Sequence, residues 1–164
     1  MKYIVLCFSL LIVGVDQLFK KLAIDYLSQE ITFPVIQDFF HLTYLENRGA
    51  AFGILSGKGV FLIVLTLIVI VFLIIIILMN KIKSKFLLWS IALVIGGGIG
   101  NLIDRVFRGF VVDYLDMRVI QFAVFNFADC CVVVGTILIM YYILFLDKKH
   151  SVNASEIGNV IKDE

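Results

Sequence analysis

The sequence predicts an all-α membrane bundle of four transmembrane helices with a small β-sheet on the outer membrane surface. Hydrophobic residues make up 62% of the 164 residues and charged residues only 16%, and the mean hydropathy is +1.06. A soluble domain does not have such a composition. Four apolar runs also approach or reach the roughly twenty residues that a helix needs to cross a bilayer. The net charge of +1 gives no indication of a nucleic-acid partner.

The four apolar runs define one domain, residues 1–150, followed by a polar segment. We expect spans at residues 3–24, 60–79, 86–103 and 127–146, with longer connections at 25–59 and 105–126. The second span carries no charge, whereas the first is interrupted by Asp16, Lys20 and Lys21. Residues 151–164 have no hydrophobic periodicity, so we expect a flexible tail there.

Basic residues predict the orientation of the bundle. The short connection between the second and third spans carries Lys81, Lys83 and Lys85, and Lys148 and Lys149 follow the fourth span. Short loops rich in lysine remain in the cytoplasm. We therefore expect both termini and the tail in the cytoplasm, with the two longer connections outside.

The outer connections contain the expected strands. Residues 40–44 alternate between apolar and polar side chains, which predicts a strand with one apolar face. The second outer connection is rich in aromatic and β-branched residues, which strands favour. We expect a small sheet on the membrane surface, with His41 as a solvated strand residue rather than a ligand.

Polar residues gather in the outer layer of the predicted bundle. They are Asp16, Lys20, Asn47, Arg48, Asn101, Asp104, Arg105, Asp113, Asn126 and Asp129. A transporter needs polar groups through the whole membrane, usually near the midplane, whereas a hydrolase that works at the surface needs them in one layer. This distribution favours a hydrolase.

Asp113 and Asp129 are the first candidates for catalysis. Asp129 is the only ionisable side chain in the fourth span, where a charge indicates a functional site by default. Two carboxylates that share a site hold one proton between them, so one can act as base on a water and the other as acid. The two histidines, His41 and His150, form no metal-binding motif and fall on opposite sides of the membrane in this topology. We therefore expect neither a metal nor a cofactor.

Structural roles remain open for the same residues. Asn126 and Asp129 have the spacing of a helix capping box, and Asp113 has the position of an exposed strand residue. Asp16 and Lys20 are one helical turn apart and can form an ion pair. Asn101, Asp104 and Arg105 can be a structural cluster, and the glycines at 96–100 favour close helix packing.

Two other functions are compatible with the residues taken singly. A small proton-linked carrier would use Asp16, Asp104 and Asp129 as an ion relay, and would transport ions without proteolysis. A purely structural partner would tolerate replacement of both Asp113 and Asp129.

Five motifs together resemble those of the bacterial lipoprotein signal peptidases (signal peptidase II). They are DQLFK at 16–20, NRGAAFG at 47–53, GNLIDR at 100–105, VVD at 111–113 and FNFAD at 125–129. The order of the motifs, the chain length and the four-span layout are similar to those of the family. The resemblance covers about residues 10–146.

The resemblance implies a function and a role for each motif residue. It implies a membrane aspartic endopeptidase of the bacterial inner membrane that cuts prolipoproteins before their diacylglyceryl-modified cysteine and is inhibited by globomycin. Asp113 and Asp129 match the catalytic aspartates, and Asn47, Asn101, Arg105 and Asn126 match the polar residues around them. Asp16 and Lys20 match residues with a structural role, and we group Asp104 with them. Cys130 departs from the serine common at its position. The partners would be the prolipoprotein and membrane lipids, and we expect a monomer.

Overall fold

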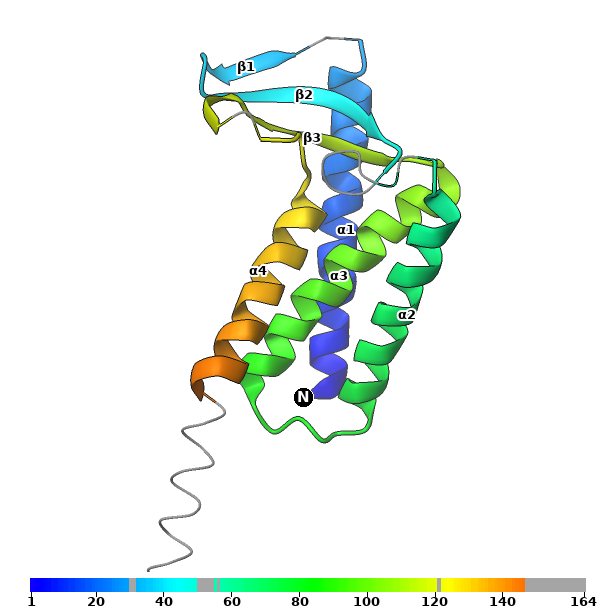
Figure 1. Ribbon diagram of the computed structural model, residues 1–164, viewed down its shortest axis with the longest axis vertical. Coiled ribbons are helices and arrows are strands. Elements are labelled where there is room, and N and C mark those ends of the chain that lie inside the picture. Colours follow the sequence, from blue (N-terminus) through cyan, green and yellow to red (C-terminus); the bar gives the residue numbers. More distant parts are fainter. Residues whose placement is uncertain (30–31, 50–54, 56, 121, 147–164) are drawn as a thin grey trace, which may run out of the picture.

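The chain folds into four long helices with a small sheet at one end of the bundle (Figure 1). The computed structural model describes residues 1–29, 32–49, 55, 57–120 and 122–146. The helices are α1 (Lys2–Leu27), α2 (Gly59–Leu78), α3 (Lys85–Phe107) and α4 (Phe127–Tyr141), which continues as the π-helix η3 (Tyr142–Leu146). The predicted tail and His150 lie outside the described residues.

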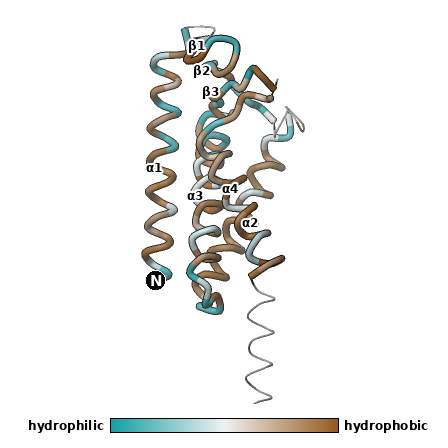
Figure 2. Tube along the Cα trace, turned by 90° about the vertical axis from the view of Figure 1, so that its left-hand side faces the viewer, coloured by the Kyte–Doolittle hydropathy of each residue, from teal (hydrophilic) through white to brown (hydrophobic). Residues whose placement is uncertain are grey.

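All four predicted spans are confirmed as helices long and apolar enough to cross a membrane. Many large apolar side chains of these helices are exposed. Along α1, hydrophilic residues gather toward the end that carries the sheet (Figure 2). The N-terminus and the α2–α3 connection lie at the end opposite the sheet (Figure 1). This arrangement agrees with the predicted topology, although which end faces the cytoplasm remains a prediction.

The third helix extends beyond the predicted span of residues 86–103. It runs to Phe107, so Arg105 lies in the helix and not in the outer connection. The backbone N–H of Arg108 donates to the carbonyl of Asp104 at 2.8 Å, and the Arg108 side chain pairs with the Asp104 carboxylate one turn earlier. These contacts continue the helix past its apolar run, beyond the predicted span of residues 86–103.

The predicted small sheet is confirmed. It is antiparallel, in the order β1 (Phe33–Ile36), β2 (Phe40–Asn47) and β3 (Val111–Met117). The register between β2 and β3 shifts between Leu42 and Leu45, and beyond this irregularity Leu45 faces Asp113 and Asn47 faces Val111. The last residues of β2 therefore lie beside the first residues of β3, which include Asp113.

Helix α3 packs against α1, α2 and α4, and the predicted close packing at its glycines is confirmed. A Cβ atom added to Gly96 would lie 2.7 Å from the Cβ of Ile12 on α1. One added to Gly97 would meet the backbone carbonyl of Ala128 on α4. The absence of side chains at these positions allows the helix backbones to approach closely.

We expect Gly97→Ala to destabilise the protein by about 2 kcal/mol, because the new methyl group would force α3 and α4 apart. The matched control is Gly14→Ala on α1, where an added Cβ meets nothing within 4 Å. In a helix, this control substitution is neutral or stabilising. Thermal unfolding of both variants in detergent measures the difference, and equal Tm values for the two variants would contradict the packing argument.

Candidate active site

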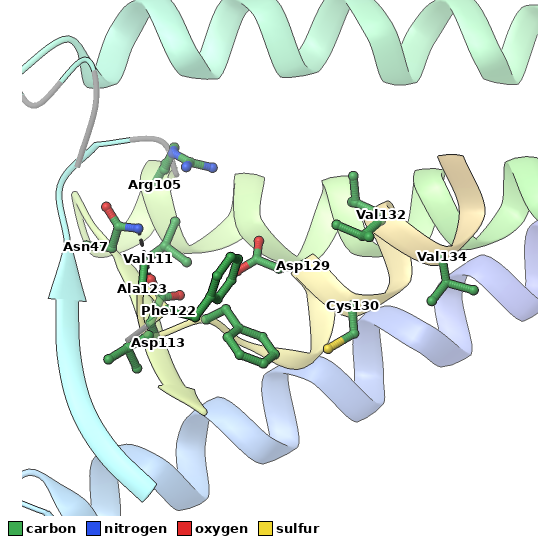
Figure 3. A pocket seen from close by; sticks show the side chains of 13 residues that line it. Asn47, Arg105, Val111, Asp113, Phe122, Ala123, Asp129, Cys130, Val132 and Val134 are labelled. Carbon is green, nitrogen blue, oxygen red and sulfur yellow. Dashed lines mark hydrogen bonds between the residues drawn. The ribbon is translucent and has the colours of Figure 1, made fainter. Parts of the chain in front are cut away.

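Asp113 and Asp129, called the aspartate pair below, come from different elements and line the same cavity. Asp113 lies in β3 and is only 1% exposed, and Asp129 lies in the first turn of α4. The cavity has a volume of about 430 Å³. Figure 3 shows the aspartate pair toward the same end of it as Asn47 and Arg105, with Val132 and Val134 toward the other end.

Two asparagine side chains connect the aspartate pair. Nδ2 of Asn126 donates to Oδ1 of Asp113 at 2.6 Å and to Oδ1 of Asn101 at 3.2 Å. Nδ2 of Asn101 in turn donates to Oδ1 of Asp129 at 2.7 Å. Asn126 and Asn101 are both buried. A continuous hydrogen-bonded path therefore runs from one carboxyl group to the other.

Asn47 completes the contacts of Asp113. Its Nδ2 donates to Oδ2 of Asp113 at 2.9 Å, while its Oδ1 accepts from the backbone N–H of Gly49 at 2.9 Å. Asp113 thus receives an amide donor on each of its two oxygens. The sequence left open whether Asp113 is an exposed strand residue, and its burial rules out that alternative.

The predicted capping box at the start of α4 is confirmed. Oδ1 of Asn126 accepts from the backbone N–H of Asp129 at 2.9 Å, and Oδ2 of Asp129 accepts from that of Asn126 at 3.2 Å. The cap uses Oδ1 of Asn126 and Oδ2 of Asp129, whereas the contacts with Asp113 and Asn101 use the other polar side-chain atom of each residue. The structural and site roles are therefore compatible, and the cap fixes the orientation of Asp129.

The pKa of Asp113 is raised to about 7, chiefly by burial and then by the negative charge of Asp129. The hydrogen bonds from Asn47 and Asn126 and the charge of Lys20 oppose the rise. A carboxyl group with such a pKa is still largely protonated just below neutral pH. Asp113 is therefore suited to hold the single proton of the aspartate pair.

This shift predicts that stability falls as the pH rises. The folded protein keeps the Asp113 proton up to about pH 7, whereas the unfolded chain loses it near pH 4, so rising pH favours the unfolded chain. We expect a loss on the order of 1 kcal/mol per pH unit across that window. Chemical unfolding from pH 4 to pH 8 tests this, and Asp113→Asn should lack that part of the slope. Parallel curves for the two proteins would contradict it.

Arg105 lies at the edge of the cavity and holds the start of the outer loop. Its Nη2 donates to the carbonyl of Gly49 at 3.1 Å. Arg48, by contrast, is exposed and pairs with Glu46 at 2.9 Å, so its side chain is not brought into the cavity. The remaining residues of that motif, 50–53, lie outside the described residues.

A second cavity, of about 300 Å³, lies between α2, α3 and α4 and also reaches Asp129 and Arg105. Its other lining residues include Thr66 and Gly98. Asp129 is therefore accessible from two sides, while Asp113 lines only the first cavity. Cys130, where the resemblance departs from the family pattern, also lines the first cavity.

The predicted ion pair between Asp16 and Lys20 is confirmed and has a third member. Nζ of Lys20 lies 2.9 Å from Oδ2 of Asp16 and 3.2 Å from Oδ2 of Asp104, and all three side chains are fully buried. We call these three residues the Lys20 cluster. The sequence analysis missed Gln17 and Arg108, which both contact Asp104. The sequence signal that could have revealed them is their position, since Gln17 follows Asp16 directly and Arg108 lies one helical turn after Asp104.

The Lys20 cluster also holds the site elements in place. The backbone N–H of Ala128 donates to Oδ1 of Asp16 at 3.1 Å, and that of Val112 donates to Oδ2 of Asp104 at 3.0 Å. Each N–H belongs to the residue just before a member of the aspartate pair. The cluster therefore attaches β3 and α4 to α1 and α3 next to both carboxyl groups.

The prediction that His41 is solvated was wrong. Its side chain is only 7% exposed, and its Nδ1 lies 3.1 Å from Oγ1 of Thr32. Thr32 contacts Thr43, which donates to Asp116, the residue opposite His41 on β3. Because both strands and the preceding segment contribute to this network, the alternation of a single strand could not reveal it. The network does not include the aspartate pair.

This fold and site define a class: multi-pass membrane enzymes with two carboxyl groups in a cavity at one end of the bundle. Comparison with known proteins identifies the family. The family model for signal peptidase (SPase) II matches residues 8–145. The chain belongs to the signal peptidase II family and is a peptidase.

Relatives and solved structures agree with this family. A lipoprotein signal peptidase of Clostridioides difficile (strain 630) is 45% identical over 140 residues, which cover 85% of this chain and 94% of that protein. One of Halothermothrix orenii is 46% identical and covers 87% and 94%. A solved structure described as a bacterial membrane enzyme has a TM-score of 0.78 and 35% identity, covering 85% of this chain and 87% of that one.

Proposed function

We propose that this protein is a membrane aspartic endopeptidase that removes signal peptides from prolipoproteins. Cleavage would occur on the N-terminal side of the diacylglyceryl-modified cysteine, at the outer face of a bacterial inner membrane. The observation that carries the proposal is the aspartate pair, which lines one cavity and is connected through Asn126 and Asn101. The names of the relatives support the substrate class.

The reaction follows from the different surroundings of the two carboxyl groups. Asp129 takes a proton from a water between the aspartate pair, and the water oxygen attacks the scissile carbonyl carbon. Asp113 gives its proton to the carbonyl oxygen, which forms a tetrahedral intermediate. The C–N bond then breaks as the proton on Asp129 moves to the leaving nitrogen, while Asp113 takes back a proton from one hydroxyl group of the intermediate, which leaves the carboxylic acid product and restores the aspartate pair. Asn47 and Arg105 lie where they can hold the peptide backbone.

The cavity suits a lipid-modified substrate. Apart from the aspartate pair, Asn47 and Arg105, its lining is mostly apolar and includes Phe122, Phe125 and Val133. Acyl chains can lie against such a surface and hold the scissile bond at the depth of the carboxyl groups. The low polarity also strengthens the electrostatic interactions of the aspartate pair.

The carrier alternative has less support. Its relay would need Asp16 and Asp104 to exchange ions, but both are committed to Lys20 within a fully buried cluster. Toward the other end of the bundle, the buried polar side chains among the described residues include Ser9 and Ser90. Both donate to backbone carbonyls of the helices.

A cleavage assay tests the proposal. Purified protein in detergent is incubated with a diacylglyceryl-modified prolipoprotein and, separately, with the unmodified precursor, and the products are separated by gel electrophoresis. We expect cleavage of the modified substrate alone. No cleavage by folded protein would overturn the proposal, and equal cleavage of both substrates would overturn the lipid requirement. Ion flux into proteoliposomes would then test the carrier.

A further inference from the structure

We propose that Lys20 is a positioning residue for the aspartate pair, because it sets the orientation of the Asn101 side-chain amide. This inference rests on the proposed function for its catalytic consequence, but its structural part can be tested without turnover. Lys20 lies on α1, away from the cavity, and does not line it. Its effect must therefore pass through the residues that it contacts.

The ammonium group of Lys20 uses all of its hydrogen-bond donors inside the bundle. Nζ contacts one oxygen each of Asp16, Asp104 and Asn101, the last at 2.8 Å. The two carboxylates compensate the charge of Lys20, and the pairing of Arg108 with Asp104 compensates the remaining negative charge. The contact with Asn101 is therefore not needed to neutralise Lys20.

The chemistry of the ammonium group decides which end of the Asn101 amide faces it. An ammonium group has three donors and no acceptor, so Asn101 must present its oxygen. Nδ2 of Asn126 donates to that same oxygen at 3.2 Å. A flipped Asn101 would place its NH₂ group against two donors and its oxygen against the carboxylate of Asp129. The orientation therefore follows from Lys20 and Asn126 together.

This orientation determines what Asp129 receives. With its oxygen toward Lys20, Asn101 presents Nδ2 to Oδ1 of Asp129 at 2.7 Å. The other oxygen of Asp129 accepts from the backbone N–H of Asn126. Donors on both oxygens fix the orientation of the Asp129 carboxyl group beside the cavity. Lys20 thus helps to position the Asp129 carboxyl group through Asn101.

Two charge-matched double variants separate this role from a structural one. Asp16→Asn/Lys20→Met and Asp16→Asn/Arg108→Met each remove one carboxylate and one cation from the same group of residues. Only the first removes the donor to Asn101, since Arg108 contacts Asp104 and Gln17 instead. We expect the Lys20 double variant to lose about 10- to 100-fold in kcat with KM little changed, the size of a misplaced catalytic contact. The Arg108 double variant should stay within about threefold of Asp16→Asn.

Two further variants make the test decisive. In an Asn101→Ala background, replacing Lys20 should cost little further activity, because its effect passes through Asn101. Asp16→Asn/Lys20→Gln restores an uncharged N–H donor and should recover part of the kcat, and it also serves if the Met variant does not fold. Equal losses in the Lys20 and Arg108 double variants, or independent losses from Lys20 and Asn101, would overturn the inference.

A spectroscopic measurement tests the orientation without turnover. Protein labelled with ¹⁵N-asparagine gives side-chain amide signals, and the signal that Asn101→Ala removes belongs to Asn101. We expect this signal to move in the Lys20 double variant and not in the Arg108 one. If the wild type does not cleave but the signal follows Lys20, the proposed function fails and the positioning role stands. If the wild type cleaves the substrate but the Asn101 signal does not move in the Lys20 double variant, the proposed function stands and the positioning role fails.

Discussion

Replacing either Asp113 or Asp129 with asparagine is expected to lower kcat for prolipoprotein cleavage by roughly 10³- to 10⁴-fold. An amide at position 113 cannot supply the proton for the carbonyl oxygen, and an amide at position 129 cannot take one from water. Both side chains keep their size, so the helices and the sheet should form. Initial rates on the lipid-modified substrate, with thermal unfolding to confirm folding, measure the effect.

Asp116→Asn is the matched control for Asp113→Asn. Asp116 lies on the same strand, is only 8% exposed and contacts Thr43 and Arg118, but it does not line the cavity. We expect this variant to lose some thermal stability and to keep its kcat within about threefold. If Asp113→Asn or Asp129→Asn retained turnover, or if Asp116→Asn lost as much, the assignment of the aspartate pair would be wrong.

The sequence predicted the membrane-spanning helices because apolar composition is a local property. Each span is recognisable from its own twenty or so residues. The end of α3 was less predictable, since Asp104 and Arg105 look like the start of a polar loop. Their partners, Lys20 and the carbonyl of Gly49, come from distant parts of the chain and allow the polar turn to remain helical.

The sequence and its resemblance to the family also predicted candidate site residues, of which the fold brings Asn47, Arg105, Asp113 and Asp129 to one cavity, but not how they contact one another. The bond from Asn47 to Asp113 depends on the register shift between β2 and β3, which no single strand reveals. The connection through Asn101 and Asn126 depends on how closely α3 approaches α4 at Gly97. Such contacts are properties of the packed fold.

The burial of polar groups was the least predictable feature. The alternation around His41 gave the strand correctly but not the threonine and aspartate that contact the ring. In the same way, the spacing of Asp16 and Lys20 indicated an ordinary ion pair on one helix. The structure adds Asp104, 84 positions farther along the chain than Lys20, as a third member of this ion pair. The spacing within one helix could not indicate this contact between α1 and α3.

The single substitution Lys20→Met is expected to destabilise the protein by about 3–5 kcal/mol, the cost of leaving buried charges uncompensated. Asp16 and Asp104 would then remain fully buried, and of these two carboxylates Arg108 pairs with Asp104. Membrane burial makes an unpaired carboxylate especially unfavourable. Thermal unfolding in detergent and the yield of folded protein measure the loss.

The charge-balanced variant Asp16→Asn/Lys20→Met separates the charge from the packing. It leaves Asp104 with Arg108, and asparagine at position 16 can still accept the hydrogen bond that the backbone N–H of Ala128 now gives to Asp16. We expect it to recover more than half of the stability that Lys20→Met loses, because no uncompensated charge remains. This variant also lacks the hydrogen bond from Lys20 to Asn101, so the recovered stability should not bring back the lost kcat. A double variant as unstable as Lys20→Met would show that packing of the lysine side chain, and not charge compensation, stabilises this part of the bundle.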